Sequence, residues 1–263
     1  EKGIESLIDL APVHNKGHLA GIRAVDHLLP TTPQVTVFDN AFHSTMPDYA
    51  YLYAVPYEIY TKYHVRRYGF HGTSHRYVSH RVAELEGKDI KDLKIITCHI
   101  GNGASVAAIK DGKVVDTSMG LTPLDGLIMG TRSGEIDPSI IKYMMNEGKM
   151  DINEIDDVLN KQSGLLGICG KSDFRDMLAL REQGDDRAIL AYEMYRDAII
   201  KHIAEYYFEL EGDVDAVVFT AGVLENNVML REDIIRMVSK TMKVKLDKKM
   251  NDNIGYGHEY REG

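Results

Sequence analysis

The sequence predicts an α/β fold, and three features of the 263-residue chain support that prediction. Three β-rich runs, 94–100, 104–110 and 113–118, follow one another with Asn-Gly and Asp-Gly corners between them, which is typical of an antiparallel meander. A long helical segment, 185–210, repeats small and apolar residues at three- and four-residue steps. A further buried-type strand, 216–220, then runs into Ala221–Gly222. The predicted inner positions of the long helix are Ala188, Ala191, Tyr195, Ala198, Ile199, His202, Ile203 and Tyr206.

The other elements are predicted from the same kinds of pattern. Residues 4–29 indicate helical pieces separated by a break at 11–18, and 34–38 is a short β-rich run. A strand there would place Asp39 at its carboxyl end, where α/β sheets bind ligands. A tyrosine-rich stretch, typical of half-buried packing or interface surface, precedes a helix that Thr73 or Ser74 would cap. Further helices are predicted over 138–147, 152–162, 173–182 and 231–241, and a last strand over 244–246.

Composition argues against several classes of function. The net charge is −9 and no basic tract stands out, which argues against nucleic-acid binding. An acidic protein that binds anions must gather positive charge locally. The two cysteines, Cys98 and Cys169, form no CxxC pair, so they indicate a reducing cytoplasm rather than a disulfide framework or a thiolate zinc site. No apolar run reaches the roughly 18 residues of a membrane span, and we expect no signal peptide.

Two glycine turns are candidates for phosphate binding. Residues 99–105 read HIGNGAS, and Gly101 and Gly103 would let backbone N–H groups approach an anion closely. An ordinary hairpin corner is the alternative interpretation of this turn. Residues 219–227 read FTAGVLENN, in which Gly222 follows a buried strand, and a helix N-terminus after such a turn binds phosphate well. The sequence contains neither GxxxxGK[ST] nor GxGxxG.

Three side chains are candidates for the chemistry. Arg132, in GTRSGEIDP, lies in a loop predicted to be mobile, and its planar fork suits phosphoryl oxygens; the plainer interpretation is a surface arginine. His71 is interpreted as a donor to a transferring phosphoryl group, although its spacing from His75 would also permit a metal pair. Asp39 is interpreted as a ligand for Mg²⁺ or a group that positions a nucleophile, or else as a turn-forming residue.

Taken together, these segments resemble the acetate kinase family, within the acetate and sugar kinase/actin superfamily. The matching segments are APVHN, FDNAFHSTMP, YGFHGTSH, HIGNGAS, TRSGEIDP and FTAGVLEN, in that order along nearly the whole chain. The resemblance implies a ribonuclease-H-like (actin-like ATPase) α/β fold, with a mixed sheet flanked by helices and two lobes, the first incomplete. Residues 1–40 would be a remnant of the N-terminal lobe, and 41–263 a C-terminal nucleotide-binding lobe that lacks its end. A homodimer is also implied.

The resemblance implies roles for individual residues as well. Asp39 would be the catalytic and metal-binding aspartate, and His71 and Arg132 the transition-state stabilisers. The nucleotide contacts would come from His99, Ile100, Gly101, Asn102, Gly103, Asp173, Phe174, Arg175, Gly222, Val223, Leu224, Glu225 and Asn226. The pocket for the acetyl methyl would be walled by Val13, Phe70 and Pro123, with His14 nearby. Leu224 stands where the family's usual A-G-I-G-E-N turn has its second glycine, so we expect strain if that position requires a positive φ.

The implied reaction is reversible in-line phosphoryl transfer between ATP and acetate, giving acetyl phosphate and ADP, with Mg²⁺ or Mn²⁺. The chain begins with Glu and lacks the family's amino-terminal N-x-G-S-S-S-x-K motif, its carboxylate-binding arginine and its late glutamate. We therefore expect a chain truncated at both ends that is inactive alone. The alternatives are a propionate or butyrate kinase of the same family, a non-catalytic nucleotide-binding module and a histidine metal hydrolase. Simple nucleotide binding needs neither His71 nor Arg132, and their presence argues against the non-catalytic module.

Overall fold

The computed structural model describes residues 1–6 and 12–253, with side chains over 1–6 and 15–253. The chain divides into two compact units, Glu1–Phe38 and the residues from Asp39 onward. The first unit contains α1 (Lys2–Glu5) and α2 (Pro12–Leu28). The guanidinium of Arg23 joins these two helices, because it lies 3.1 Å from the Glu1 carboxylate and 3.0 Å from that of Glu5.

Two predictions for the first unit are wrong. The predicted break at 11–18 does not occur over its described part, since α2 runs unbroken from Pro12, and proline is well tolerated as a first helical residue. Residues 34–38 do not form a strand, and within the described residues no other strand pairs with them. Val35 is 86% exposed, so this β-rich run lacks both the hydrogen-bonded partner and the burial that a strand requires.

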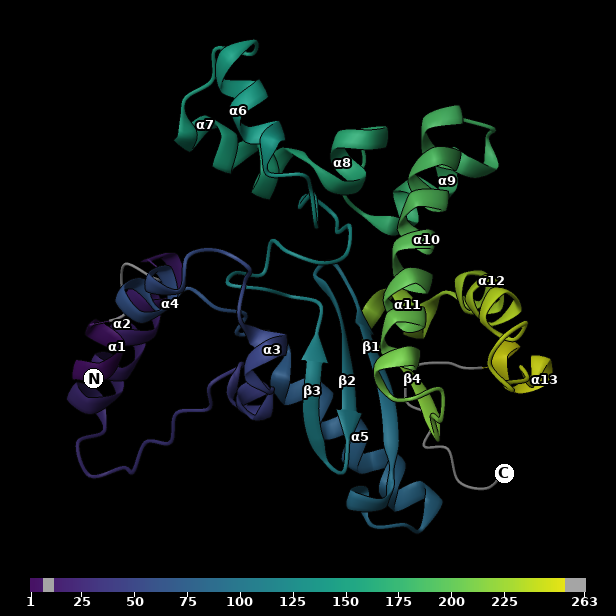
Figure 1. Cartoon of the computed structure of the whole chain (residues 1–263), viewed down its shortest axis with the longest axis horizontal. Coiled ribbons are helices and arrows are strands. Elements are labelled where there is room, and N and C mark those ends of the chain that lie inside the picture. Colours follow the sequence, from purple (N-terminus) through teal and green to yellow (C-terminus); the bar gives the residue numbers. More distant parts are fainter. Residues whose placement is uncertain (7–11, 254–263) are drawn as a thin grey trace. The chain divides into compact units, whose positions relative to one another are not determined.

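The second unit is built on a mixed sheet with the strand order β3-β2-β1-β4 (Figure 1). The predicted meander is present as β1 (Lys94–Ile100), β2 (Ala104–Lys110) and β3 (Lys113–Thr117), all antiparallel. The strand β4 (Ala216–Thr220) returns parallel to β1 after a long helical crossover. The predicted α/β fold with a mixed sheet is therefore confirmed. The predicted last strand at 244–246 is wrong, because these residues carry no regular structure.

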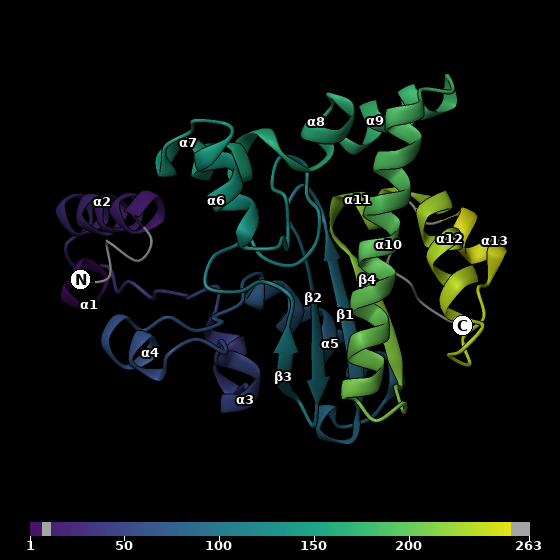
Figure 2. The same cartoon turned by 45° about the horizontal axis from the view of Figure 1, so that its top comes forward.

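Helices cover both faces of the sheet (Figure 2). Side chains alternate along β1, so Ile96, Cys98 and Ile100 face the core formed with α10 (Asp186–Glu209). The opposite face, which carries Ile95 and Thr97, is covered by α5 (Gly72–Glu86) and by the 3₁₀ segment η2 (Ala41–Thr45). The polar groups of this second face lead to the site described below.

The long helix α10 is buried at seven of the predicted inner positions, which are Ala188, Ala191, Tyr195, Ile199, His202, Ile203 and Tyr206. Ala198 is only half-buried. Tyr192 was not predicted, yet it is fully buried, and its hydroxyl donates to Asp233 Oδ2 at 2.6 Å. The periodicity therefore located the buried face, but it missed a residue whose polar tip has a partner on another helix.

The remaining elements are mostly short helices. Before the sheet lie α3 (Asp48–Tyr51), α4 (Tyr57–Tyr63) and η3 (Ile90–Asp92). Between β3 and α10 lie α6 (Ser139–Asn146), α7 (Ile152–Asp157), the π-helical η4 (Val158–Gln162), α8 (Gly164–Cys169) and α9 (Phe174–Glu182). After β4 come α11 (Ala221–Asn226), α12 (Val228–Val238) and α13 (Lys248–Asp252). None of the described helices combines the length and the apolar character needed to cross a membrane.

Candidate active site

The start of α5 brings Asp39 and His71 together. His71 precedes the helix with a left-handed φ of 56°, so the predicted capping by Thr73 or Ser74 is wrong. The backbone N–H of His71 donates to Asp39 Oδ2 at 2.7 Å, and that of Gly72 donates to the Asp39 carbonyl at 2.7 Å. A Cβ on Gly72 would collide with that carbonyl oxygen. The glycine after His71 therefore permits the close approach of two segments that lie far apart in sequence.

The side chains of His71 and Arg132 meet at the turn between β1 and β2. A Cβ built on Gly103 would lie 3.4 Å from His71 Nε2 and 3.6 Å from Arg132 Nη1. The ring of His71 stacks on that of His99 with 4.1 Å between the centroids, and His99 Nδ1 lies 2.8 Å from Ser74 Oγ. The structure thus brings the three predicted chemical groups, Asp39, His71 and Arg132, to one place.

The loop that carries Arg132 is held in position rather than free. The Met129 N–H donates to the Arg132 carbonyl at 3.1 Å, and the Ser163 N–H donates to the Thr131 carbonyl at 3.0 Å. The guanidinium Nη1 donates to the Pro123 carbonyl at 3.3 Å. These hydrogen bonds hold the loop and its arginine in one position in this structure.

Two of the predicted substrate-pocket residues lie beside these groups. Pro123 contacts Arg132 through its carbonyl, and Phe70 directly precedes His71, with its own carbonyl 2.8 Å from His43 Nε2. The other two predictions, Val13 and His14, lie outside the described side chains.

Burial controls the charge of the histidines at this site. Desolvation lowers the pKa of His71 to about 4, helped by nearby His99 and Arg132 and opposed by the Asp39 carboxylate. Desolvation also lowers the pKa of His75, which is fully buried, far below its usual value. The imidazoles are therefore neutral near pH 7, and Arg132 supplies the positive charge that faces Gly103.

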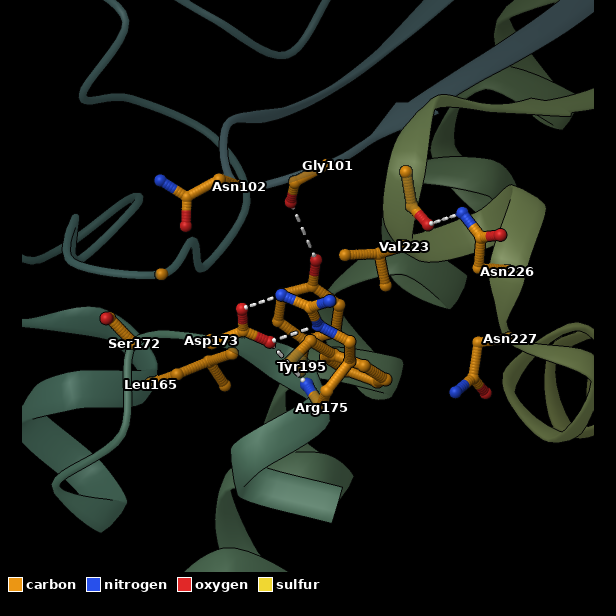
Figure 3. A pocket seen from close by; sticks show the side chains of 13 residues that line it. Gly101, Asn102, Leu165, Ser172, Asp173, Arg175, Tyr195, Val223, Asn226 and Asn227 are labelled. Carbon is orange, nitrogen blue, oxygen red and sulfur yellow. Dashed lines mark hydrogen bonds and ion pairs between the residues drawn. The ribbon is translucent and has the colours of Figure 1, made fainter. Parts of the chain in front are cut away.

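A cavity of about 530 Å³ opens at Gly101, at the other end of the same turn (Figure 3). This volume lies within the range of small-molecule sites. Eight predicted nucleotide-binding residues line it: Gly101, Asn102, Asp173, Phe174, Arg175, Gly222, Val223 and Asn226. Five further lining residues were not predicted: Gly130, Leu165, Ser172, Tyr195 and Asn227. Two of these carried a usable signal, since Gly130 is the first residue of the arginine motif and Tyr195 was a predicted inner position of α10.

Hydrogen bonds tie the walls of the cavity to one another. The Tyr195 hydroxyl reaches the Gly101 carbonyl at 3.4 Å, and the Gly130 N–H donates to the Asn102 carbonyl at 3.2 Å. Asp173 caps α9 and also binds the Arg175 guanidinium, with an Nη2 to Oδ2 distance of 2.6 Å. This pairing holds the pKa of Asp173 at about 2. The Gly130 contact links the Arg132 loop directly to the cavity wall.

Five predicted nucleotide contacts do not line the cavity: His99, Ile100, Gly103, Leu224 and Glu225. Leu224 is fully buried in the core, within helical α11, so the strain predicted for it is absent. The left-handed residue of this turn is instead Ala221, with a φ of 70°. The Glu225 carboxylate turns back to accept hydrogen bonds from the Ala221 N–H and the Thr220 hydroxyl, both at 2.8 Å. Glu225 therefore stabilises the shape of the turn.

Within the described residues, no group of three or more His, Cys, Asp or Glu side chains is placed to hold a metal ion. The pair that the sequence suggested, His71 and His75, is also engaged elsewhere. His75 Nδ1 lies 2.7 Å from Thr97 Oγ1, and its Nε2 lies 2.8 Å from Ser105 Oγ. Both of its ring nitrogens are hydrogen-bonded, so His75 has no lone pair available for a metal.

Comparisons with known proteins agree with this architecture. A family model described as the acetokinase family matches residues 1–260. The acetate kinase of Acetivibrio thermocellus is 55% identical over 249 residues, which are 94% of this chain and 62% of that protein. The acetate kinase of Porphyromonas gingivalis superposes with a TM-score of 0.91 at 46% identity, covering 95% of this chain and 63% of that one. A propionate kinase from Francisella tularensis gives the same score and identity, covering 96% and 65%. The chain thus spans somewhat under two thirds of its relatives' length, and it belongs to the acetokinase family.

Proposed function

We propose that the full-length protein containing this chain transfers a phosphoryl group reversibly between ATP and acetate, giving acetyl phosphate and ADP. One observation carries the proposal: a nucleotide-sized cavity begins at Gly101, while His71 and Arg132 meet at Gly103 in the same turn. A nucleotide bound in the cavity would therefore direct its phosphates along this turn toward both side chains. The names of relatives that are 52–55% identical support the same activity.

The proposed mechanism requires positioning rather than a strong base. Acetate is already an anion, so catalysis depends on alignment and on neutralising the charge of the transferring group. The Arg132 guanidinium would contact the equatorial oxygens, and neutral His71 would donate a hydrogen bond to them from its Nε2–H. Phe70 and Pro123 would contact the acetyl methyl; Phe70 directly precedes His71, and the Pro123 carbonyl accepts a hydrogen bond from Arg132.

The residues at Asp39 fit a magnesium ion that arrives with the nucleotide. Asp39 Oδ2 accepts the His71 N–H, and Oδ1 makes no hydrogen bond within the described part of the chain. One available carboxylate oxygen is what Mg²⁺ needs when phosphates and water supply its other ligands. Such an ion would offset the negative charge of the phosphates. We propose Asp39 as the ligand that this chain contributes.

The test is Arg132→Ala in the full-length protein, assayed with acetate, ATP and Mg²⁺. Loss of a guanidinium that stabilises the transferring group is expected to lower kcat by about 10³ or more. The matched control is Arg187→Ala, an exposed arginine of α10 that is expected to leave kcat unchanged. Near-normal turnover of Arg132→Ala would refute the assigned role. The 263-residue chain alone is expected to show no turnover.

The Francisella tularensis propionate kinase supports a second candidate, because it is as similar in structure as the acetate kinase. A methylene group changes the transition-state energy by only about 1–3 kcal/mol, so the two substrates are separated weakly. The ratio of kcat/KM for acetate, propionate and butyrate decides between them. A ratio that favours propionate would replace acetate in the proposal.

We also propose that the full-length protein is a cytoplasmic homodimer. The tyrosine-rich segment supplies a candidate contact surface, since Tyr49, Tyr57 and Tyr63 are 74%, 65% and 64% exposed. Aromatic side chains with a polar tip suit such interfaces. The molar mass from light scattering tests the dimer, and a monomer at micromolar concentration would contradict it.

A further inference from the structure

A line of hydrogen-bonded side chains leads from the interior of the sheet to His71. Thr97 Oγ1 lies 2.7 Å from His75 Nδ1, and His75 Nε2 lies 2.8 Å from Ser105 Oγ. The same Ser105 Oγ lies 2.8 Å from His71 Nδ1. The line therefore reaches the ring nitrogen of His71 on the side away from Gly103.

The fold brings these four residues together. Thr97 on β1 and Ser105 on β2 point to the same face of the sheet, because Ser105 pairs with His99, two residues beyond Thr97. His71 and His75 are separated by one turn at the start of α5, which covers that face. Thr97, His75 and Ser105 are each fully buried, so water does not compete for their hydrogen bonds.

The direction of the donors follows from counting protons. A neutral imidazole has one N–H, and each hydroxyl donates one hydrogen bond. If His71 were protonated on Nδ1, it would donate to Ser105, Ser105 to His75, and His75 to Thr97. The buried Thr97 hydroxyl would then have no acceptor within the described residues. An unsatisfied buried donor is costly, so this direction is disfavoured.

The opposite direction satisfies every buried proton. Thr97 donates to His75 Nδ1, His75 donates from Nε2 to Ser105, and Ser105 donates to His71 Nδ1. The only N–H left is that on His71 Nε2, the atom that faces Gly103 beside Arg132. Within the described residues this nitrogen makes no hydrogen bond, and it is not one of the buried polar atoms without a partner, so it is accessible to a ligand.

We propose that Thr97, His75 and Ser105 are positioning residues that fix the tautomer of His71, so that its proton lies on Nε2 and points at the transferring phosphoryl group. The proposal rests on the proposed function for its consequence in rate, but not for the tautomer itself. A ring held in one tautomer does not have to exchange its proton before it can donate, so the donor is ready when the nucleotide binds.

The test combines ¹⁵N-histidine NMR with kinetics on the full-length protein. The protonated and unprotonated ring nitrogens of histidine have well-separated ¹⁵N shifts, so the spectrum reports the tautomer of His71 directly. The variants are Thr97→Val, which removes the first donor with little change of shape, and Ser105→Ala, which removes the link to His71. Thr117→Val is the matched control, because Thr117 is an equally buried threonine of the sheet whose hydroxyl donates to the Val106 carbonyl instead.

In the unmodified protein the proton of His71 is expected on Nε2 alone. Ser105→Ala should give a mixture of tautomers and lower kcat by about 10–100-fold, with the KM values little changed. Thr97→Val should also give a mixture of tautomers and lower kcat by about 5-fold, which is the effect of one hydrogen bond. Thr97→Ser should restore both the single tautomer and kcat. Thr117→Val should change neither.

Two results would overturn the proposal: a proton on Nδ1 of His71 in the unmodified protein, or a Thr97→Val variant whose spectrum and kcat match those of Thr117→Val. The failure of the proposed function looks different. In that case the Nε2 proton and its response to Ser105→Ala persist, while no acetate phosphorylation is detected in any variant.

Discussion

The two ends of the turn between β1 and β2 differ in how far their side chains are exposed to solvent. At the Gly103 end, His71 and His75 are each hydrogen-bonded to the buried Ser105 hydroxyl, and desolvation lowers the pKa of both histidines. At Gly101, the cavity wall carries an open ion pair in which the Arg175 side chain is 88% exposed. The groups behind His71 are therefore buried and already hydrogen-bonded, whereas the wall of the nucleotide end carries a solvent-exposed ion pair.

This difference matches the demands of the two tasks. A group that stabilises developing charge works best when its dipole is oriented before the reaction, and that orientation is provided during folding. A site for the rest of the nucleotide needs shape and a few polar contacts, which solvated side chains can provide on binding. We therefore expect substitutions at the Gly103 end to change kcat, and substitutions at the Gly101 end to change KM for ATP or stability.

The largest expected departure from this contrast concerns Arg231, a buried residue at the nucleotide end. Its guanidinium donates to the carbonyls of Leu224 and Glu225, at the end of α11, and to Asn251. Arg231→Met keeps the apolar stem but leaves those buried carbonyls unpaired, so it should cost about 3 kcal/mol of unfolding free energy. It should also raise KM for ATP, because α11 carries Gly222, which lines the cavity.

Urea denaturation and ATP kinetics of the full-length protein provide the measurements. Arg236→Met is the matched control on the same helix, where the arginine is 65% exposed and pairs with Asp233. That surface change should cost less than about 1 kcal/mol. If Arg231→Met lost no more stability than Arg236→Met, the hydrogen bonds of buried Arg231 would not be needed to hold α11. The nucleotide end would then have no buried polar group that supports it.

The next prediction uses pH to separate the two ends. Burial lowers the pKa of His75 in the folded state. Below about pH 6.5, His75 therefore binds a proton in the unfolded chain but not in the folded chain. Stability should therefore fall as the pH drops, by at most about 1.4 kcal/mol per pH unit for this one residue. The Asp173 carboxylate has a pKa of about 2, lowered by its hydrogen bond to Arg175. Its contribution to stability is lost only when the pH falls below the pKa of an ordinary carboxyl, toward 2.

Urea midpoints between about pH 7.5 and 5 measure this slope, because the histidine end titrates there and the Asp173 pair does not. In His75→Gln the slope should be shallower than in the unmodified protein. His80→Gln, which alters a histidine of the same helix that lies outside this hydrogen-bonded line, should keep the original slope. An unchanged slope in His75→Gln would show that acid sensitivity arises elsewhere.

The sequence predicted the sheet better than it predicted the site. Local patterns defined the four strands to within one residue, because β-rich composition and glycine corners are short-range signals. The run at 34–38 failed for the opposite reason. Its composition favours a strand, but strand formation depends on a partner that no local pattern reports.

At the site, the motifs identified the groups but not their connections. Asp39, His71 and Arg132 come together from separate segments, as the motifs suggested. Ser105 and Thr97 received no prediction, because a serine or threonine in a strand has no distinctive pattern until its tertiary partner is known. Leu224 misled for a related reason, since a motif comparison pointed to strain, whereas the backbone carries its positive φ at Ala221.

The smallest expected effect is at the half-buried Asp173, which both caps α9 and pairs with Arg175. Asp173→Ala removes the cap of α9, which should cost about 1 kcal/mol, and it also frees Arg175. Asp151→Ala is the control, because Asp151 also caps a helix, α7, through its side chain and does not line the cavity. Equal losses of stability are expected, with a change of a fewfold in KM for ATP only in Asp173→Ala, since a solvated pair contributes little binding energy. If both variants bound ATP equally well, Asp173 would act only as the cap of α9. Nucleotide binding would then depend on the glycines of the cavity and on α11.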